Sequence, residues 1–286
     1  MTNVDQREAW NGASGEEWVR TEEQHDSQLV PWAELLAATA DVQPGERVLD
    51  VGCGTGATTL AAARAAGAEG GVVGVDLSAP MTARARERAT EQGLTNVRFE
   101  VGDAQTDDLT LGGEPYDVVI SRFGVMFFDD PRAAFANMHR AMRPGGRLAM
   151  VVWAPLELQD WLRVPMLAAI AHVPAPENFG GAAGGPGMFA LADVDGATDI
   201  LGGAGWKDIA LEPHERTMLL GGPGTLDETV QFVLGSNAGR TVFNPDNAPP
   251  DAIERGIAAM RAALAKHQTP QGVELKGTGM LITARS

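Results

Sequence analysis

The stretch LDVGCGTGATT (residues 49–59) places three glycines within five positions, after a short apolar run and before an alanine-rich segment. Glycine at a strand-to-helix turn lets the main chain approach a ligand, and the N-terminus of the following helix points at that ligand. Gly52, Gly54 and Ala57 also satisfy the dinucleotide-binding pattern G-x-G-x-x-G/A, whereas a P-loop is excluded because no Lys-Ser or Lys-Thr follows. The turn therefore predicts a ligand site, with a tight turn that holds no ligand as the alternative.

Short apolar runs alternate with amphipathic segments of helical length on both sides of this turn. Such alternation is typical of βαβ units and of a parallel sheet covered by helices on both faces. The predicted strands are residues 47–52, 70–78, 96–104, 117–121, 147–153, 206–218 and 277–286. The predicted helices are residues 31–40, 58–67, 79–93, 131–146, 190–206, 225–234 and 249–267. The sequence predicts an α/β fold with a doubly wound, Rossmann-like sheet of seven mostly parallel strands.

Segments outside this alternation divide the chain. Residues 1–45 carry three tryptophans and end in a helical stretch, so we expect an N-terminal helical arm or lid there. Residues 46–286 form the expected main domain. Within that domain, breaks in the pattern predict cap insertions at about 154–190 and 219–272.

The composition excludes several classes of protein. The 286 residues carry 22 basic against 38 acidic side chains, a net charge of -16, which disfavours nucleic acid as a partner. Cys53 is the only cysteine, so neither an intramolecular disulfide nor a cysteine-based zinc site can form. The single cysteine fits a reducing compartment and residues 1–18 are polar and acidic, so we expect a cytoplasmic protein. We also expect no membrane span, because no stretch approaches the ~18 continuous apolar residues that a spanning helix needs.

Three acids lie at the ends of predicted strands, where ligands bind in doubly wound sheets. They are Asp50, Asp76 and Asp103. Three carboxylates around one crevice suit a ligand with a ribose diol, an amine and a positive centre better than a pyrophosphate.

Five motifs in order resemble those of class I S-adenosylmethionine-dependent methyltransferases. They are VLDVGCGTG, GVDLS, GDA, YDVVIS and RPGGRLAMVVW, which together span roughly residues 46–153. The sequence is most similar to the small-molecule branch related to ubiquinone and menaquinone biosynthesis enzymes. The resemblance implies S-adenosyl-L-methionine as the cofactor.

The resemblance also implies roles for individual residues. The main chain of Gly52, Cys53 and Gly54 would follow the methionine half of the cofactor, and Asp50 would orient its amino group. Asp76 would accept both ribose hydroxyls. The remaining implied cofactor-binding residues are Leu77 on the adenine ring, Asp103 and Ala104 at the adenine edge, Ser121 and Arg122 near the methionine moiety, and Trp18 as part of a lid.

The acceptor side of the site is predicted to be apolar. Its expected pocket residues are Phe123, Met126, Phe127 and Trp153. We expect methyl transfer to a small, largely apolar acceptor of secondary-metabolite, quinone, polyketide or prenyl-like character, mainly through proximity and orientation. His25 and His172 are the candidates for a general base, and no pair of histidines has metal-ligand spacing, so we expect no metal.

Two other functions remain open at this stage. A protein with this fold can bind the cofactor and instead sense a ligand or catalyse a cyclisation or rearrangement. An NAD(P)-dependent oxidoreductase shares the fold, although the RPGG motif and the lack of a Tyr-Lys pair argue against it. Assembly into a homo-oligomer also remains open.

Overall fold

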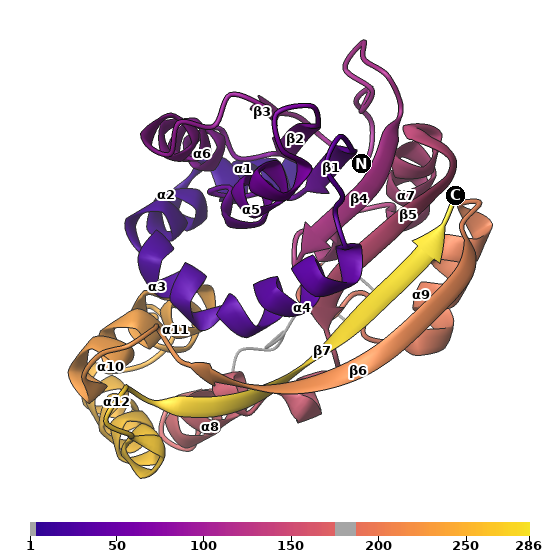
Figure 1. Ribbon diagram of the computed structural model, residues 1–286. Helices are drawn as coiled ribbons and strands as arrows, with labels where there is room; N and C mark the ends of the chain where they lie inside the picture. The colour runs from indigo at the N-terminus through magenta and orange to yellow at the C-terminus, as the bar shows by residue number, and fades with distance from the viewer. Residues whose placement is uncertain (1–3, 175–186) are drawn as a thin grey trace.

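A seven-stranded sheet forms the centre of the molecule. The computed structural model describes residues 4–174 and 187–286 (Figure 1). The strands lie in the order β3-β2-β1-β4-β5-β7-β6. β7 runs antiparallel to both β5 and β6, and all other neighbouring pairs are parallel. They are β1 (Arg47–Val51), β2 (Gly71–Asp76), β3 (Val97–Val101), β4 (Tyr116–Arg122), β5 (Met142–Trp153), β6 (Lys207–Leu219) and β7 (Glu274–Arg285). The predicted α/β fold with a mostly parallel seven-stranded sheet is confirmed.

Helices cover both faces of the sheet (Figure 1). Helices α4 and α5 contact each other over β4, β5 and β1, whereas α7 and α9 contact each other behind the sheet. The helices are α1 (Val4–Asn11), α2 (Ala13–Arg20), α3 (Glu22–Gln28), α4 (Val30–Ala40), α5 (Ala57–Ala66), α6 (Ala79–Glu91), α7 (Pro131–Arg140), α8 (Asp160–Ile170), α9 (Val194–Gly203), α10 (Leu226–Gly235), α11 (Asn237–Val242) and α12 (Pro250–Leu264). In the part of the chain that the structure describes, none of these helices is long and apolar enough to cross a bilayer.

Local chemistry sets several helix boundaries. Ser78 accepts a hydrogen bond from the N–H of Met81 at the start of α6, and Asp130 does the same for Ala133 at the start of α7. The expected helix over 131–146 ends earlier than predicted, at Arg140, and residues from Met142 onward already belong to β5. Pro144 cannot continue the helical hydrogen-bond ladder, which explains the difference.

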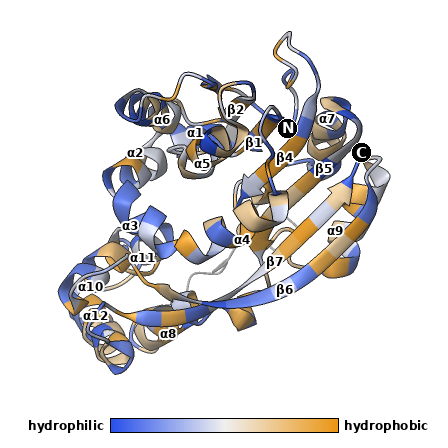
Figure 2. Cartoon of the chain, in the orientation of Figure 1, coloured by the Kyte–Doolittle hydropathy of each residue, from blue (hydrophilic) through white to orange (hydrophobic). Residues whose placement is uncertain are grey.

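The main core lies around β1, β4 and β5. Their side chains are buried on both faces of the sheet, as expected of central parallel strands. Figure 2 shows orange, apolar residues along β4 and β5, whereas outer helices such as α6 and α12 carry many blue, polar residues. Trp32 of α4 is completely buried in this core, and its Nε1 lies 2.9 Å from the Sδ of Met218 in β6.

A second core lies at the far end of the long β6–β7 pair, where α8, α10 and α12 gather (Figure 1). It includes Met166, Phe232, Met260 and Leu275. The residue ranges expected as cap insertions, 154–190 and 219–272, contain these helices, although residues 175–186 lie outside the described part of the chain.

The turns after β1 and β4 touch through their main chains. Gly52 has a φ of +70°, and a Cβ added there would lie 2.5 Å from the Cα of Gly124. A Cβ on Gly124 would lie 2.7 Å from the Cα of Gly52. Only glycine at both positions allows the two turns to approach this closely.

Replacement of Gly52 by alanine should therefore cost more stability than the same change where there is space. Gly112 has the same φ of +70° with nothing within 4 Å of an added Cβ, so Gly112→Ala measures the backbone strain alone. We expect Gly112→Ala to lower the free energy of unfolding by about 1 kcal/mol and Gly52→Ala by about 2 kcal/mol more, because of the added clash. Urea unfolding without ligand measures both. Equal losses in the two variants would contradict the close contact.

Candidate active site

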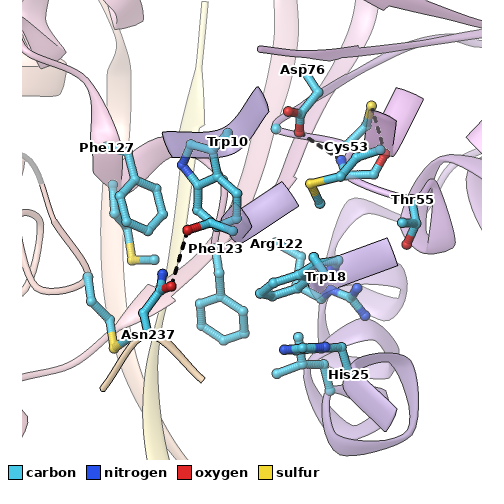
Figure 3. Close-up of a pocket in the computed structure, with 18 of the residues that line it drawn as sticks. Trp10, Trp18, His25, Cys53, Thr55, Asp76, Arg122, Phe123, Phe127 and Asn237 are labelled. Carbon is cyan, nitrogen blue, oxygen red and sulfur yellow. Dashed lines mark hydrogen bonds between the residues drawn. The ribbon is translucent and has the colours of Figure 1, made fainter. Parts of the chain in front are cut away.

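One cavity lies beyond the carboxyl ends of β1, β2, β4 and β5, under the N-terminal helices α1–α3. The turns after β1 and β2 contribute Gly52, Cys53, Gly54 and Asp76 to its wall. Its opposite part is lined by aromatic side chains from distant segments, namely Trp10, Trp18, Phe123, Phe127, Phe128, Trp153, Trp161 and Phe232. In Figure 3, Asp76 and Cys53 lie together on one side, with Trp10 and Phe127 across from them. The cavity therefore has a polar end and an aromatic end.

Asp76 dominates the polar end. Its Oδ2 accepts a hydrogen bond of 2.8 Å from the N–H of Gly54, and its Oδ1 accepts one of 2.8 Å from the N–H of Ser78. Burial raises the pKa of this carboxyl group, which the two backbone hydrogen bonds oppose. Each oxygen keeps a second lone pair for a ligand donor. No cationic side chain in the described ranges forms an ion pair with Asp76.

The thiol of Cys53 has no charge to offer a ligand. Burial raises its pKa well above the ordinary value, and neighbouring carboxylates add to this effect. The residue therefore acts on a ligand through its main chain.

Ion pairs hold α3 over the site. Glu22 pairs with Arg84 at 2.8 Å, and Asp26 pairs with Arg88 at 2.7 Å, both arginines belonging to α6. Asp26 also lies 3.5 Å from Arg122 at the end of β4, which lines the cavity. Because the guanidinium of Arg122 is buried, its pKa is lowered, and Asp26 and Asp50 counter this. The cluster connects the N-terminal helices to two elements of the sheet domain.

Stacked and edge-on rings build the aromatic end. Phe123 stacks on Trp153 with ring centroids 3.9 Å apart and an interplanar angle of 10°. Its φ of +60° is rare for a residue with a bulky side chain, and such strained backbone clusters at functional sites. Trp10 meets Phe127 and Trp18 edge-on at 5.7 and 6.0 Å. The α1–α2 segment thus forms part of the aromatic wall.

His25 of α3 lies in the wall of the aromatic end. Its ring stacks on Trp18 at 3.8 Å, with the two rings one above the other in Figure 3. Its Nδ1 lies 3.0 Å from the carbonyl oxygen of Thr21. Burial lowers the pKa of His25 to about 4, so the imidazole is neutral at physiological pH.

Most residues predicted from the sequence meet in this cavity. Those that line it are Trp18, His25, Gly52, Cys53, Gly54, Asp76, Leu77, Ala104, Arg122, Phe123, Met126, Phe127 and Trp153. Four others do not line it. They are Asp50, Asp103, Ser121 and His172.

Each of these four lies elsewhere for a physical reason. Asp50 is completely buried behind the wall, where Thr58 and Thr59 both donate to its Oδ2 at 2.7 Å. Asp103 is also buried, and its Oδ1 accepts from the N–H of Gln105 in the following turn.

Ser121 in β4 and His172 after α8 also do not line the cavity. The hydroxyl of Ser121 donates to the carbonyl of Val51 at 2.7 Å, which ties β4 to β1 instead of reaching a ligand. His172 follows the last turn of α8 as an exposed residue and is not among the residues that line the cavity, contrary to the expectation that it reaches the acceptor.

Several lining residues carried no signal in the sequence. Gln28, Phe232, Asn237 and Arg240 come from α3 and from the α10–α11 region. The latter is separated from the glycine turn by more than half of the chain, and it lies between β6 and β7 in the element order.

Fold and site together define an α/β protein with a ligand-sized cavity at the first turns of its sheet. The chain matches the family model described as Methyltransferase domain over residues 48–146. It is 35% identical over 193 residues to nocamycin O-methyltransferase of Saccharothrix syringae, an alignment that covers 65% of this chain and 67% of that protein. The chain belongs to the class I S-adenosylmethionine-dependent methyltransferases, as its motifs predicted.

Two further similarities agree with this assignment. The ubiquinone/menaquinone biosynthesis C-methyltransferase UbiE of Xanthomonas campestris is 32% identical over 132 residues, which are 46% of this chain and about half, 51%, of that protein. The crystal structure of YcgJ from Bacillus subtilis shares the fold, with a TM-score of 0.57 at 19% identity over 89% of this chain and 97% of that one.

The buried neutral His25 predicts a loss of stability in weak acid. Its folded-state pKa of about 4 lies below the ordinary value of 6.5, so the unfolded chain binds the proton more tightly. The stability present above pH 6.5 is then lost as the pH falls toward 4, at about 1.4 kcal/mol per pH unit. Between pH 7 and pH 5, the free energy of unfolding should fall by about 2 kcal/mol less in His25→Gln than in the unmodified protein. Urea unfolding at both pH values measures this, and equal losses would contradict the burial of a neutral imidazole.

Proposed function

We propose that the cavity binds S-adenosyl-L-methionine at its polar end and a small, largely apolar acceptor at its aromatic end. The observation that carries this proposal is the continuity of one cavity from Asp76 to the Phe123–Trp153 stack. A shared cavity lets two molecules meet in a fixed orientation, which supplies much of the rate of a displacement reaction.

The residues at the polar end fit the cofactor. Asp76 offers a free lone pair on each carboxylate oxygen to the two ribose hydroxyls. The main chain of Gly52, Cys53 and Gly54 lines this end, so the methionine portion can lie against it. Leu77 and Ala104 line the same end and provide apolar contact for the adenine. The unneutralised carboxylate also favours a positively charged ligand.

The cofactor, when bound, supplies a methyl group on a positively charged sulfur. The chain's own contribution is to hold the acceptor and exclude water. The rings of Trp10, Trp18 and Phe127 cover the cavity, and Phe123 and Trp153 offer flat apolar faces to an acceptor. For an oxygen acceptor, the unprotonated ring nitrogen of His25 takes up the hydroxyl proton.

The acceptor has aromatic, quinone, polyketide or prenyl-like character in this proposal. The aromatic wall supports it, since flat rings pack well against stacked side chains. The names of the relatives also support it, because one acts in nocamycin O-methylation and another in quinone biosynthesis. We further propose that the N-terminal helices open as a lid, because polar contacts that water can replace, including the ion pairs of α3, connect them to the rest of the chain.

Asp76→Ala should lower the affinity for S-adenosylhomocysteine at least ~10-fold, because two charge-assisted hydrogen bonds are lost. Asp193→Ala is a matched control, since Asp193 also accepts from a backbone N–H but caps α9 away from the cavity. Isothermal titration calorimetry gives both dissociation constants, and we expect the control to match the unmodified protein. An unchanged affinity in Asp76→Ala, or tight binding of NADH with no binding of the adenosyl ligands, would contradict the proposal.

A further inference from the structure

One face of α3 presents two polar side chains to the cavity. His25 and Gln28 are three residues apart, so they are neighbours on the helix surface. Both line the cavity, and Gln28 is only 4% exposed. The surrounding wall is aromatic, with Trp18 stacked on His25 and Phe232 at 4.9 Å from it. Polar groups in such a wall determine which ligand atoms fit there.

The orientation of the Gln28 amide is fixed by its partner. The N–H of Gly221 donates to the Oε1 of Gln28 at 2.9 Å. A backbone N–H can only donate, so the oxygen of the amide must face Gly221. The Nε2 group has no hydrogen-bond partner within the described ranges 4–174 and 187–286, which leaves its two hydrogens to a ligand in the cavity. Gln28 is therefore a hydrogen-bond donor to whatever occupies this part of the site.

The polarity of His25 is fixed in the same way. The hydroxyl of Thr21 cannot donate a proton to the ring of His25, because it already donates its single proton to the carbonyl of Glu17 at 2.7 Å. The Nδ1 of His25, which lies 3.0 Å from the carbonyl of Thr21, must then carry the ring proton and donate it. In the neutral ring, Nε2 is left as an acceptor with a free lone pair. His25 and Gln28 thus offer an acceptor and a donor side by side.

We propose that His25 and Gln28 together select an acceptor molecule that carries both a hydroxyl and a carbonyl group. The hydroxyl donates to the Nε2 of His25, and the carbonyl accepts from the Nε2 of Gln28. The ring system that bears both groups packs against Trp18 and Phe232. This inference rests on the proposed function, because it assigns the aromatic end to the acceptor, and it narrows the acceptor to a hydroxy-carbonyl compound.

Three ligands that share one bicyclic scaffold test the hydrogen bonds with His25 and Gln28 separately. They are 7-hydroxy-1-tetralone, which has both groups, 1-tetralone, which lacks the hydroxyl, and 5,6,7,8-tetrahydro-2-naphthol, which lacks the carbonyl. Binding is measured by quenching of tryptophan fluorescence with S-adenosylhomocysteine present. We expect 7-hydroxy-1-tetralone to bind about fivefold tighter than either of the others, since each lacks one hydrogen bond.

The variants should remove one preference each. Gln28→Leu should abolish the preference over 5,6,7,8-tetrahydro-2-naphthol and keep the preference over 1-tetralone. Gln28→Glu keeps an acceptor for the Gly221 N–H but has no amide donor, so it should lose the same preference. It therefore tests the same contact if Gln28→Leu does not fold. His25→Phe retains an aromatic ring beside Trp18 and should abolish only the preference over 1-tetralone.

The outcomes distinguish this inference from the proposed function. Calorimetry with S-adenosylhomocysteine on the same proteins tests the cofactor end independently. If the unmodified protein binds this nucleoside but does not prefer 7-hydroxy-1-tetralone, or if the variants weaken all three ligands equally, the inference is overturned while the proposed function stands. If the unmodified protein does not bind the nucleoside, the proposed function itself fails.

Discussion

The main-chain contact between Gly52 and Gly124 is the constraint on which the rest of the site depends. It joins the turn after β1 to the turn after β4, and it exists because neither residue has a side chain. On one side of the contact, the β1 turn places the N–H of Gly54 on the carboxylate of Asp76. On the other side, Phe123 is held at a positive φ, where its ring stacks on Trp153. This main-chain contact therefore positions residues at both the polar end and the aromatic end of the cavity.

Charge pairing then determines how the cavity is covered. The chain carries a net charge of -16, yet three of its arginines converge on Glu22 and Asp26 of α3. These pairs are partly buried, so they are less screened by salt than pairs at the open surface. They hold the face of α3 that bears His25 and Gln28 over the site. The arm thus adds two polar side chains to a wall made largely of aromatic rings.

The sequence predicted the sheet well, because glycine turns and apolar runs are local signals. Gly52, Gly54 and Asp76 were found for the same reason, since each directly follows or ends a strand. Asp103 and Ser121 do not line the cavity, because a strand-end position does not tell whether a polar side chain turns to the ligand or to the backbone. His172 was expected in a cap over the acceptor, but it lies exposed after α8. Gln28 and Phe232 could not be found, because their place in the cavity depends on long-range packing of α3 and α10. Phe123 was expected in the pocket, but its positive φ follows only from the tertiary contact.

The central claim is that a single cavity holds the nucleoside against Asp76 and leaves the aromatic end free for an acceptor. A crystal structure of the complex with S-adenosylhomocysteine tests this most directly. The account predicts both ribose hydroxyls within hydrogen-bonding distance of the Asp76 carboxylate, with the sulfur facing the stacked rings of Phe123 and Trp153. A nucleoside bound away from Asp76, or one whose adenine packs against the stacked rings of Phe123 and Trp153, would contradict it.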